Sequence, residues 1–399
     1  MAFQPSRRDV LVAGLGVAGL LTRGPLPLAW AAPVDETRMG QSDRSSSAPT
    51  SPVAIERCSS YEPQVLRTAL DQAFDHMGGL KKLVENKTVT IKLNLTGGQA
   101  GKIGGLEPFE TYHTHPKFVA AVCAALHGAG AKRIVLVESH YSLKPPEETL
   151  IGLGWDVRAI QSAGGNTVEF VNTRNLGTAK KYTRMKVNGG GFMYPAYDLH
   201  PAYEQTDVFV SLAKMKEHAV AGVTLTAKNL FGITPQSLYG DGSPNENNVN
   251  ARLAILHEGT QKVPAGLPTE LKHGLATGDV KHRVPRVTAD LFIARPLDLA
   301  IIDGIQTNRG GEGPWIDGVT PVQPKLIFVG RNGVCTDSIC AATMGYNPQG
   351  RHDQAPYQGD NHLRLLAAAG MGSNDPNRIE VRGLKLGEAS FPFKAAAKS

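Results

Sequence analysis

Asp207-Val-Phe-Val-Ser-Leu212 is an apolar run of strand length that leads directly into Lys214-Met-Lys216-Glu-His218. A second run, Arg133-Ile-Val-Leu-Val-Glu138, is also almost continuously apolar. Strands that are buried on both faces have this composition, which is typical of a parallel sheet covered by helices. On both sides of these two runs, strand patterns alternate with helical patterns along the chain. The sequence therefore predicts an α/β fold with a largely parallel sheet and helices on both faces.

The predicted elements follow from periodicity and from turn residues. Strands are expected over 53–57, 88–95, 133–138, 167–171, 207–212, 297–302, 325–329 and 378–381. Helices are expected over 63–76, 117–127, 146–153, 286–294, 335–344 and 361–369. Residues 53–399 are predicted to form a single α/β domain with a long irregular insertion at about 237–285, which is either a cover for an active site or an added segment.

The first 31 residues are interpreted as an export signal. Ser6-Arg7-Arg8-Asp9-Val10-Leu11 resembles the twin-arginine pattern of Tat substrates, and Ala29-Trp30-Ala31 suits signal peptidase. An ordinary Sec signal or an uncleaved anchor is the alternative. We expect export by the Tat translocase to the periplasm or otherwise out of the cytoplasm. Residues 32–52 are polar and rich in serine and proline, and they are predicted to be a disordered tether.

Charge and cysteine content narrow the classes of partner and cofactor. The signal carries three arginines and one aspartate, so its removal lowers the net charge from +6 to +4. No basic stripe is interleaved with aromatic residues, so nucleic acid is not an expected partner. Beyond the signal no stretch approaches ~18 consecutive apolar residues, so no membrane span is expected. None of the four cysteines has C-x-x-C spacing, which disfavours an iron–sulfur cluster or a zinc site, and Cys123 is expected in the core.

Polar residues that follow the strands are the candidate site, because ligands bind beyond the carboxyl ends of parallel strands. Lysines beside glycine-rich turns favour a small anion there. Carboxylates that converge would suit a divalent metal, a candidate cofactor. The candidate catalytic residues are Lys214, Lys216, His218 and Lys228. The candidate substrate-binding residues are Lys92, Asn94, His115, His140 and Asn229, and the candidate metal ligands are Asp303, Glu312 and Asp337.

Each candidate has a structural alternative. Lys214 and Lys216 could be solvated at a strand end, and Asn94 could cap a turn. His115 precedes a proline that opens a predicted helix, so it could be an N-cap residue.

Arg331 and Asn332 follow the predicted strand 325–329. We expect them on the same side of the sheet as the residues that follow the other strands.

Six motifs occur in an order that resembles one protein family. They are Lys92-x-Asn94, Thr114-His115-Pro116, Lys214-x-Lys216-x-His218, Lys228-Asn229-Leu-Phe-Gly232, Asp303-Gly304 with Gly311-Glu312-Gly313-Pro314, and Met344-Gly345-Tyr346. Over roughly residues 52–350 the chain resembles the "domain of unknown function 362" family. The resemblance implies a fold and candidate positions, and it implies no reaction. Some members of that family add ferredoxin-type cysteine clusters, which this chain lacks.

One segment also resembles lactate racemase-like enzymes, which use a nickel-pincer nucleotide. His218, Ala221, Gly222 and Lys228 match their pattern in identity and spacing. The resemblance implies that the lysine tethers a cofactor and that the histidine does acid–base work. Thr224 and Thr226 depart from the pattern, the glycine pair is missing, and no nickel-ligand histidine follows at the expected distance.

Two functions remain open at this point. The first is an enzyme for a small anionic, carboxylate-bearing substrate, with His218 as acid or base and a lysine as anion partner or covalent partner. The second is a periplasmic protein that binds an anion or a metal without turnover. Turnover requires a titrating group within hydrogen-bond reach of the ligand, whereas binding requires only charge and shape.

Overall fold

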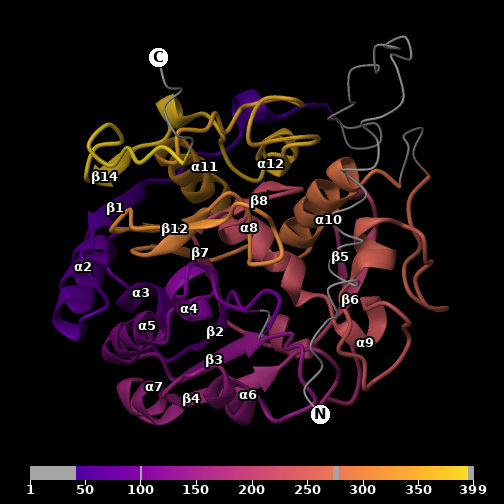
Figure 1. Cartoon of the computed structure of the whole chain (residues 1–399), viewed down its shortest axis with the longest axis horizontal. Coiled ribbons are helices and arrows are strands. Elements are labelled where there is room, and N and C mark those ends of the chain that lie inside the picture. The colour runs from indigo at the N-terminus through magenta and orange to yellow at the C-terminus, as the bar shows by residue number, and fades with distance from the viewer. Residues whose placement is uncertain (1–41, 99–100, 273–277, 394–399) are drawn as a thin grey trace.

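One eight-stranded sheet organises the part of the chain that the computed structural model describes, which is residues 42–98, 101–272 and 278–393. Figure 1 shows helices packed on both sides of this sheet. From edge to edge the strands are β14 (Val381–Gly383), β1 (Val53–Arg57), β13 (Leu326–Gly330), β10 (Leu299–Gly304), β7 (Val208–Lys214), β2 (Thr88–Lys92), β3 (Arg133–Glu138) and β4 (Val168–Asn172). The predicted α/β fold is confirmed.

All strands of this sheet run in the same direction except β13, which is antiparallel to both of its neighbours. The carboxyl end of β13 therefore lies on the side of the sheet opposite to the carboxyl ends of β2, β3, β7 and β10. For this reason the expectation that Arg331 and Asn332 lie beside the other strand ends is wrong. Asn332 instead caps α11 (Gly333–Thr343), where its side chain accepts a hydrogen bond from the Cys335 backbone N–H.

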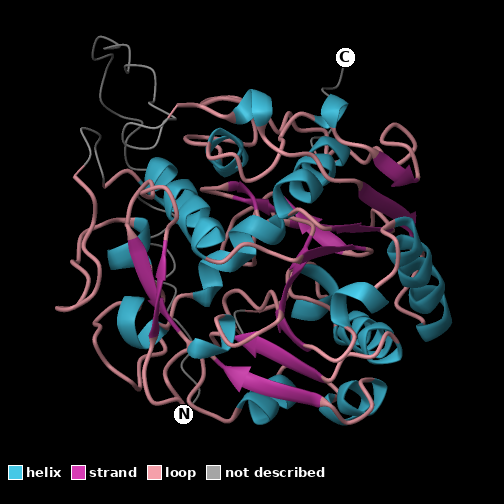
Figure 2. Ribbon diagram, turned by 180° about the vertical axis from the view of Figure 1, so that it is seen from behind, coloured by secondary structure: helices cyan, strands magenta, loops and turns pink. Residues whose placement is uncertain are grey.

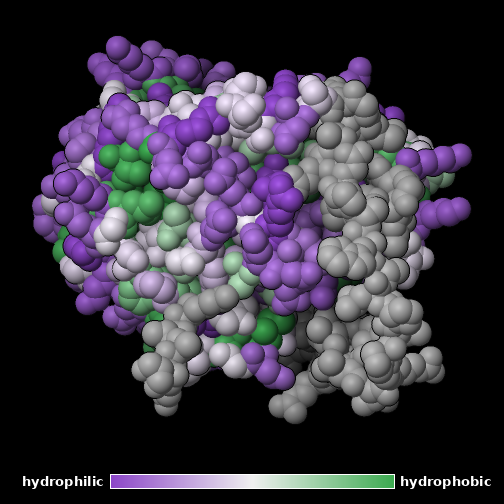
Figure 3. Space-filling model, turned by 90° about the horizontal axis from the view of Figure 1, so that it is seen from above, coloured by the Kyte–Doolittle hydropathy of each residue, from purple (hydrophilic) through white to green (hydrophobic). Residues whose placement is uncertain are grey.

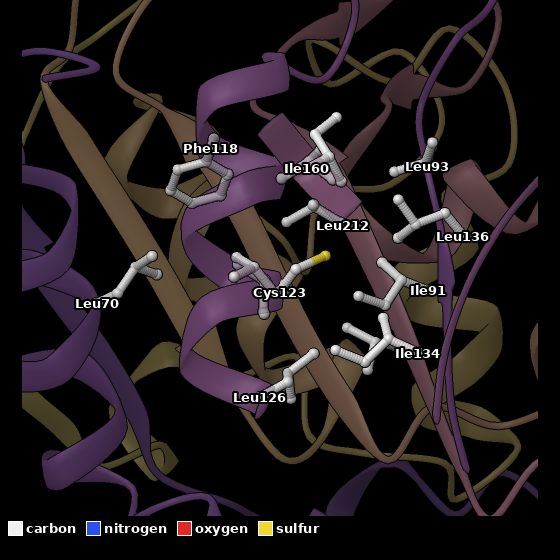
Figure 4. Packing of buried hydrophobic residues seen from close by; sticks show 14 of the residues in the cluster. Leu70, Ile91, Leu93, Phe118, Cys123, Leu126, Ile134, Leu136, Ile160 and Leu212 are labelled. Atoms are coloured by element: carbon white, nitrogen blue, oxygen red, sulfur yellow. The ribbon is translucent and has the colours of Figure 1, made fainter. Parts of the chain in front are cut away.

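One face of the sheet is covered by α2 (Pro63–His76), α5 (Pro116–Gly128) and α7 (Val157–Ala163). Helix α2 begins with proline at its first position and buries Leu66, Leu70 and Phe74, which recur at helical spacing. Figure 4 shows the core of this face, where Cys123 of α5 points toward the apolar side chains of the strands. The prediction that Cys123 is a core residue is confirmed. Burial of each large apolar side chain stabilises the fold by ~1.5–3 kcal/mol.

The other face carries α8 (Leu225–Asn229), α10 (Val280–Ala294), α11 and α12 (His362–Ala368). Helix α10 begins six residues before the predicted start, because Asp279 caps it by accepting from the Lys281 backbone N–H at 2.9 Å. Figure 2 shows these helices from behind. Shorter helices are α3 (Lys81–Val84), α4 (Pro108–Thr111), α6 (Pro146–Gly152) and α9 (Gln236–Tyr239).

Three two-stranded hairpins stand beside the main sheet. They pair β5 (Thr183–Lys186) with β6 (Ala196–Leu199), β8 (Glu217–His218) with β9 (Gly222–Val223), and β11 (Thr307–Arg309) with β12 (Thr320–Val322). Single helical turns are η1 (Ser45–Ser47), η2 (Pro201–Tyr203), η3 (Leu230–Ile233), the π-turn η4 (Leu253–His257) and η5 (Pro376–Arg378). Turn η4 and helix α9 are the regular elements within the described part of the predicted insertion that precedes α10.

The described start of the chain packs on the domain. The Arg44 backbone N–H donates to the Ala368 carbonyl at 3.0 Å, and Ala48 is buried. The Arg378 guanidinium donates to the carbonyls of Ser45 and Ala48. Residues 42–52 of the predicted tether are therefore held against α12 and η5. The predicted export signal, residues 1–31, lies outside the described residues.

Hydrophilic residues predominate on the face of the molecule shown in Figure 3. Leu143 and Ile151 are the exposed large hydrophobic residues in the described ranges. In those same ranges no helix has both the length and the hydropathy that a bilayer crossing requires. All four cysteines lie in described segments, and each is unpaired and buried.

Candidate functional site

The carboxyl ends of four neighbouring strands carry buried charged residues. Lys92 ends β2, Glu138 ends β3, Lys214 ends β7, and Asp303 is the last residue but one of β10. All four have at most 5% of their surface exposed. A charge buried so deeply requires a partner, so the contacts of each residue indicate whether it remains available to a ligand.

Lys214 and Asp303 form a buried ion pair across adjacent strands. The Lys214 Nζ lies 2.9 Å from the Asp303 Oδ2, and both side chains are fully buried. The Tyr61 hydroxyl donates to the Asp303 Oδ1 at 2.8 Å, and the Lys214 ammonium also donates to that hydroxyl at 3.0 Å. Burial lowers the pKa of Lys214, and the charge of Asp303 offsets part of that effect. This pair satisfies its own charges.

Lys92 and Glu138 form a second buried pair. The Lys92 Nζ lies 2.7 Å from the Glu138 Oε1, and it also donates to the Leu93 carbonyl and, at 3.4 Å, to the Asn229 Oδ1. Burial lowers the pKa of Lys92, while Glu138 opposes the shift. Gly232 lies against this pair, because a Cβ at that position would stand 3.0 Å from the Lys92 Nζ. Glycine in the Lys228-Asn229-Leu-Phe-Gly232 motif thus leaves room for the ion pair.

Lys216 is fully buried and has no carboxylate partner within ion-pair distance in the described residues. Its ammonium donates to the carbonyl oxygens of Tyr112 at 2.8 Å and Glu312 at 3.1 Å. Burial lowers its pKa well below the ordinary value, and the charges of Lys214 and Lys228 add to the shift. The Lys216 amine is therefore held by backbone carbonyls and not by a carboxylate.

Lys228 differs from the other three lysines because its amine has no hydrogen bond or ion pair to the described residues. Its Nζ lies 4.1 Å from the centroid of the Phe231 ring, and the residue keeps 8% of its surface exposed. Burial lowers the pKa of Lys228 to about 7; Glu312 opposes the shift, and Arg252 and Lys92 add to it. A lysine in such surroundings is partly neutral at physiological pH and can act as a nucleophile.

The segment that carries Lys228 is held by Asp337 of α11. The Asp337 carboxylate accepts the backbone N–H groups of Thr226 and Ala227 at 2.9 and 2.8 Å, and it accepts the Thr226 hydroxyl at 2.6 Å. Three donors on one buried carboxylate give α8 a defined orientation, so Asp337 acts as an anchor for the residue that follows.

Three histidines lie within electrostatic range of Lys228, and we refer to Lys228, His218, His257 and His362 as the Lys228 cluster. Burial, and then the charge of Lys228, lowers the pKa of His257 to about 4 and that of His362 to about 3. The same two causes, in the same order, lower the pKa of His218 well below its ordinary value. All three rings are therefore neutral near pH 7.

Hydrogen bonds indicate which nitrogen carries the proton in two of these rings. The His218 Nδ1 accepts the backbone N–H groups of Val220 and Ala221 at 3.2 and 3.3 Å, so the neutral ring carries its proton on Nε2. The His257 Nδ1 lies 3.0 Å from the Arg252 carbonyl, which can only accept, so the His257 Nε2 keeps its lone pair. The cluster thus contains a neutral donor, His218, and a neutral acceptor, His257.

The His362 ring is fully buried, and neither of its nitrogens has a partner of good hydrogen-bond geometry, although the Ala221 backbone is near. Buried polar atoms without a partner are uncommon, and they mark places where a ligand or water would be satisfied. His362 is therefore a further candidate for ligand contact.

A cavity of about 400 Å³ lies beside the cluster. His218 lines it together with Gly222, Lys281, Tyr346 and Tyr357. Gly222 has a φ of +80°, and a Cβ there would stand 2.5 Å from the Tyr357 ring, so the close approach of the β8–β9 hairpin to Tyr357 requires glycine. Among the sequence-predicted site residues, His218 is the one that lines this cavity.

The remaining predicted substrate-binding residues have surroundings of their own. His115 caps α5 by accepting the Lys117 backbone N–H at 3.2 Å, and its ring stacks on Tyr61 at 3.6 Å. Asn94 is buried, and its Oδ1 has no partner in the described residues. The pKa of His140 falls to about 4, mainly through burial. The Asn229 amide donates to the Ser211 hydroxyl at 3.0 Å.

The three candidate metal ligands are each engaged elsewhere. Asp303 pairs with Lys214, Asp337 anchors α8, and Glu312 accepts the Ala219 backbone N–H at 2.8 Å and the Trp315 indole N–H at 3.0 Å. Across the described ranges, no group of three or more His, Cys, Asp or Glu side chains is arranged to hold a metal ion. The predicted metal site stays a prediction.

Sequence reasoning missed Arg252, His257 and His362. Arg252 and His257 come from the segment that was predicted to be an irregular insertion, where no periodicity marks a functional residue. The Arg252 guanidinium donates to the Ser139 hydroxyl at 2.7 Å and to the Thr234 carbonyl. The unusual length of that segment was the one available signal, because long irregular segments in compact domains frequently cover sites. His362 opens α12, and nothing in its local sequence distinguishes it.

Residues 89–342 match the family described as "Domain of unknown function (DUF362)", and the chain belongs to that family. No curated protein matches the chain. Two solved structures resemble it distantly. A protein from Thermotoga maritima is 12% identical with a TM-score of 0.36, and the match covers 72% of this chain and 60% of that one. The lactate racemase apoprotein from Thermoanaerobacterium thermosaccharolyticum is 13% identical with a TM-score of 0.35, and the match covers 68% of this chain and 54% of that one.

Proposed function

We propose that this member of the DUF362 family is an enzyme for a small carboxylate-bearing anion, which it binds at the Lys228 cluster. The observation that carries the proposal is a group of buried basic side chains with few acidic partners. Lys216, Lys228 and Arg252 gather where Glu312 is the nearby carboxylate not already in a lysine pair. Burial lowers the pKa of both lysines, so a bound anion favours their protonated forms and supplies a counter-charge.

The neutral histidines favour turnover over simple binding. His218 offers an N–H donor that can polarise a substrate oxygen, and His257 offers a lone pair that can accept a proton. A protein that only binds an anion needs neither group in a defined tautomer. Binding without turnover is the second candidate function, and it would use the same cations.

We propose that the protein binds its substrate after export from the cytoplasm. The twin-arginine motif at Arg7 and Arg8 supports a periplasmic or otherwise exported location through the Tat translocase. The divalent metal predicted from the sequence stays a prediction, and the proposal does not depend on it.

The test measures binding and turnover separately. Wild-type protein is titrated calorimetrically with acetate, lactate, pyruvate, succinate and inorganic phosphate, and the same mixtures in D₂O are followed by NMR for exchange or product. We expect Lys228→Met to abolish binding, whereas Lys82→Met, which removes a lysine from an exposed site on α3, should bind as wild type. His218→Asn should spare binding and slow turnover by ~10²–10⁴-fold.

Two other outcomes decide between the candidates. Binding that depends on Lys228 with no exchange or product from any probe would favour the binding protein. Failure of all these anions to bind wild-type protein would overturn the proposal.

A further inference from the structure

The Lys228 amine is available for chemistry in a way that the other buried lysines are not. Lys92 and Lys214 are paired with carboxylates at 2.7 and 2.9 Å, and Lys216 is held by two carbonyl oxygens. The Lys228 Nζ faces the Phe231 ring and has no hydrogen-bond acceptor in the described residues. The face of the Phe231 ring attracts an ammonium ion but provides no hydrogen-bond acceptor, and burial without acceptors favours the neutral amine.

The cations around Lys228 reinforce this preference. Arg252 and Lys92 lie close enough to oppose a positive charge on Lys228, and burial makes the largest contribution to the shift. A lysine that is desolvated beside other cations is the arrangement that activates an amine for attack on a carbonyl. Asp337 holds the preceding residues of α8 and so limits the directions in which the amine can point.

Donors for a carboxylate lie in the same neighbourhood. When protonated, the Lys216 amine has three N–H groups and two acceptors, and among the described residues the Arg252 Nη1 contacts the Tyr141 hydroxyl alone, at 3.5 Å. Each cation therefore keeps at least one N–H that a ligand oxygen could accept. The His218 Nε2–H is a third donor, suited to a carbonyl oxygen.

We propose that Lys228 forms an imine with a small carboxylic acid that also carries an aldehyde or ketone carbonyl. This inference rests on the proposed function and names the substrate class for the same site. The Nζ lone pair adds to the carbonyl carbon, and the carbonyl π electrons move to oxygen, which takes up a proton as the nitrogen loses one. The resulting carbinolamine loses its hydroxyl as water, which takes up the second proton of the amine nitrogen, and a C=N bond forms. Amine and carbonyl thus give imine and water, and no oxidant or reductant takes part.

His218 and His257 have defined parts in this sequence. The His218 Nε2–H donates to the carbonyl oxygen as negative charge develops there, and the His257 Nε2 accepts the proton that the amine nitrogen releases. Both rings are neutral near pH 7 before the reaction, so neither opposes the entry of the substrate carbonyl with a charge of its own.

Reductive trapping tests the inference directly. Wild-type protein is incubated at pH 7.5 with pyruvate or glyoxylate and cyanoborohydride, and the modified residue is mapped by peptide mass spectrometry. We expect the secondary-amine adduct at Lys228, and we expect it in Lys82→Met but not in Lys228→Met. Pyruvamide, the neutral analogue, should trap about ten-fold less or weaker still, because it cannot make the charge-assisted hydrogen bonds of a carboxylate.

The outcomes separate this inference from the function on which it rests. Adducts spread evenly over exposed lysines, or a Lys228 peptide that stays unmodified in wild-type protein, would overturn the imine. If wild-type protein in that case still binds acetate or lactate through Lys228, the proposed function stands without covalent chemistry. If no carboxylate binds, both fall. Mapping of the wild-type adduct needs no variant, so a variant that fails to fold leaves the test intact.

Discussion

Removal of one partner from the Lys214–Asp303 pair should destabilise the fold far more than removal of both. Both side chains are fully buried with their charged atoms 2.9 Å apart, so Lys214→Met leaves a carboxylate with only Tyr61 and the Ile305 N–H as donors. An uncompensated buried charge costs ~3–5 kcal/mol in the free energy of unfolding. Asp303→Asn alone should cost less, because burial already lowers the pKa of Lys214 and the amine can deprotonate.

The double variant Lys214→Met/Asp303→Asn has no buried charge at this position, and its amide can still accept from Tyr61. It should recover most of the loss, so a double-mutant cycle in urea should give an interaction energy of ~2 kcal/mol or more. The exposed pair Lys117–Glu62, with its atoms 3.3 Å apart, is the matched control, and Lys117→Met should change stability by less than ~1 kcal/mol. Additivity of the two single variants within ~0.5 kcal/mol would refute the ion-pair assignment and return Lys214 to the candidate catalytic residues.

Three further predictions concern Asp290, Lys228 and the arginine pair of the export signal. The Asp290 carboxylate accepts hydrogen bonds from the backbone N–H groups of Phe192, Met193 and Tyr194 and from the Tyr197 hydroxyl. Asp290→Asn should therefore lower the free energy of unfolding, measured in urea, by ~2–4 kcal/mol. A change under ~0.5 kcal/mol, which is what we expect for the exposed control Asp71→Asn, would contradict this prediction. Since the pKa of Lys228 is about 7, its acetylation rate should level off above about pH 8, whereas the rate of an exposed lysine, with a pKa of ~10.4, keeps rising with pH. Between pH 7 and ~10 this lysine is protonated in the unfolded chain and mostly neutral in the folded protein, so its contribution to the free energy of unfolding should increase with pH over that range. A Lys228 rate that rises throughout that range would show an ordinary lysine. Replacement of Arg7 and Arg8 by lysine should leave precursor in the cytoplasm on cell fractionation, and an unchanged exported yield would exclude the Tat interpretation.

Much of the site could be placed from sequence because strand ends are local features. Lys92, Lys214 and Asp303 follow apolar strand patterns, and the parallel arrangement brings those ends to one edge. The same reasoning failed at β13, because an apolar strand looks alike in either direction. Its antiparallel pairing with β1 and β10 depends on the path of the chain between them.

The sequence also could not predict which group each lysine contacts. Lys214, Lys216 and Lys228 are close in sequence and chemically identical, yet the first pairs with Asp303, the second binds carbonyl oxygens and the third has an unbound amine. Arg252, His257 and His362 reach the same neighbourhood from distant segments.

The sequence by itself determined the α/β class, the burial of the central strands and the motifs that identify the family, because periodicity and motif spacing are written in adjacent residues. Only the tertiary structure decided which lysine keeps a free amine and which histidine nitrogens carry protons. Those properties depend on burial and on the distance between groups far apart in the chain, and both arise only when the sheet and its helices pack together.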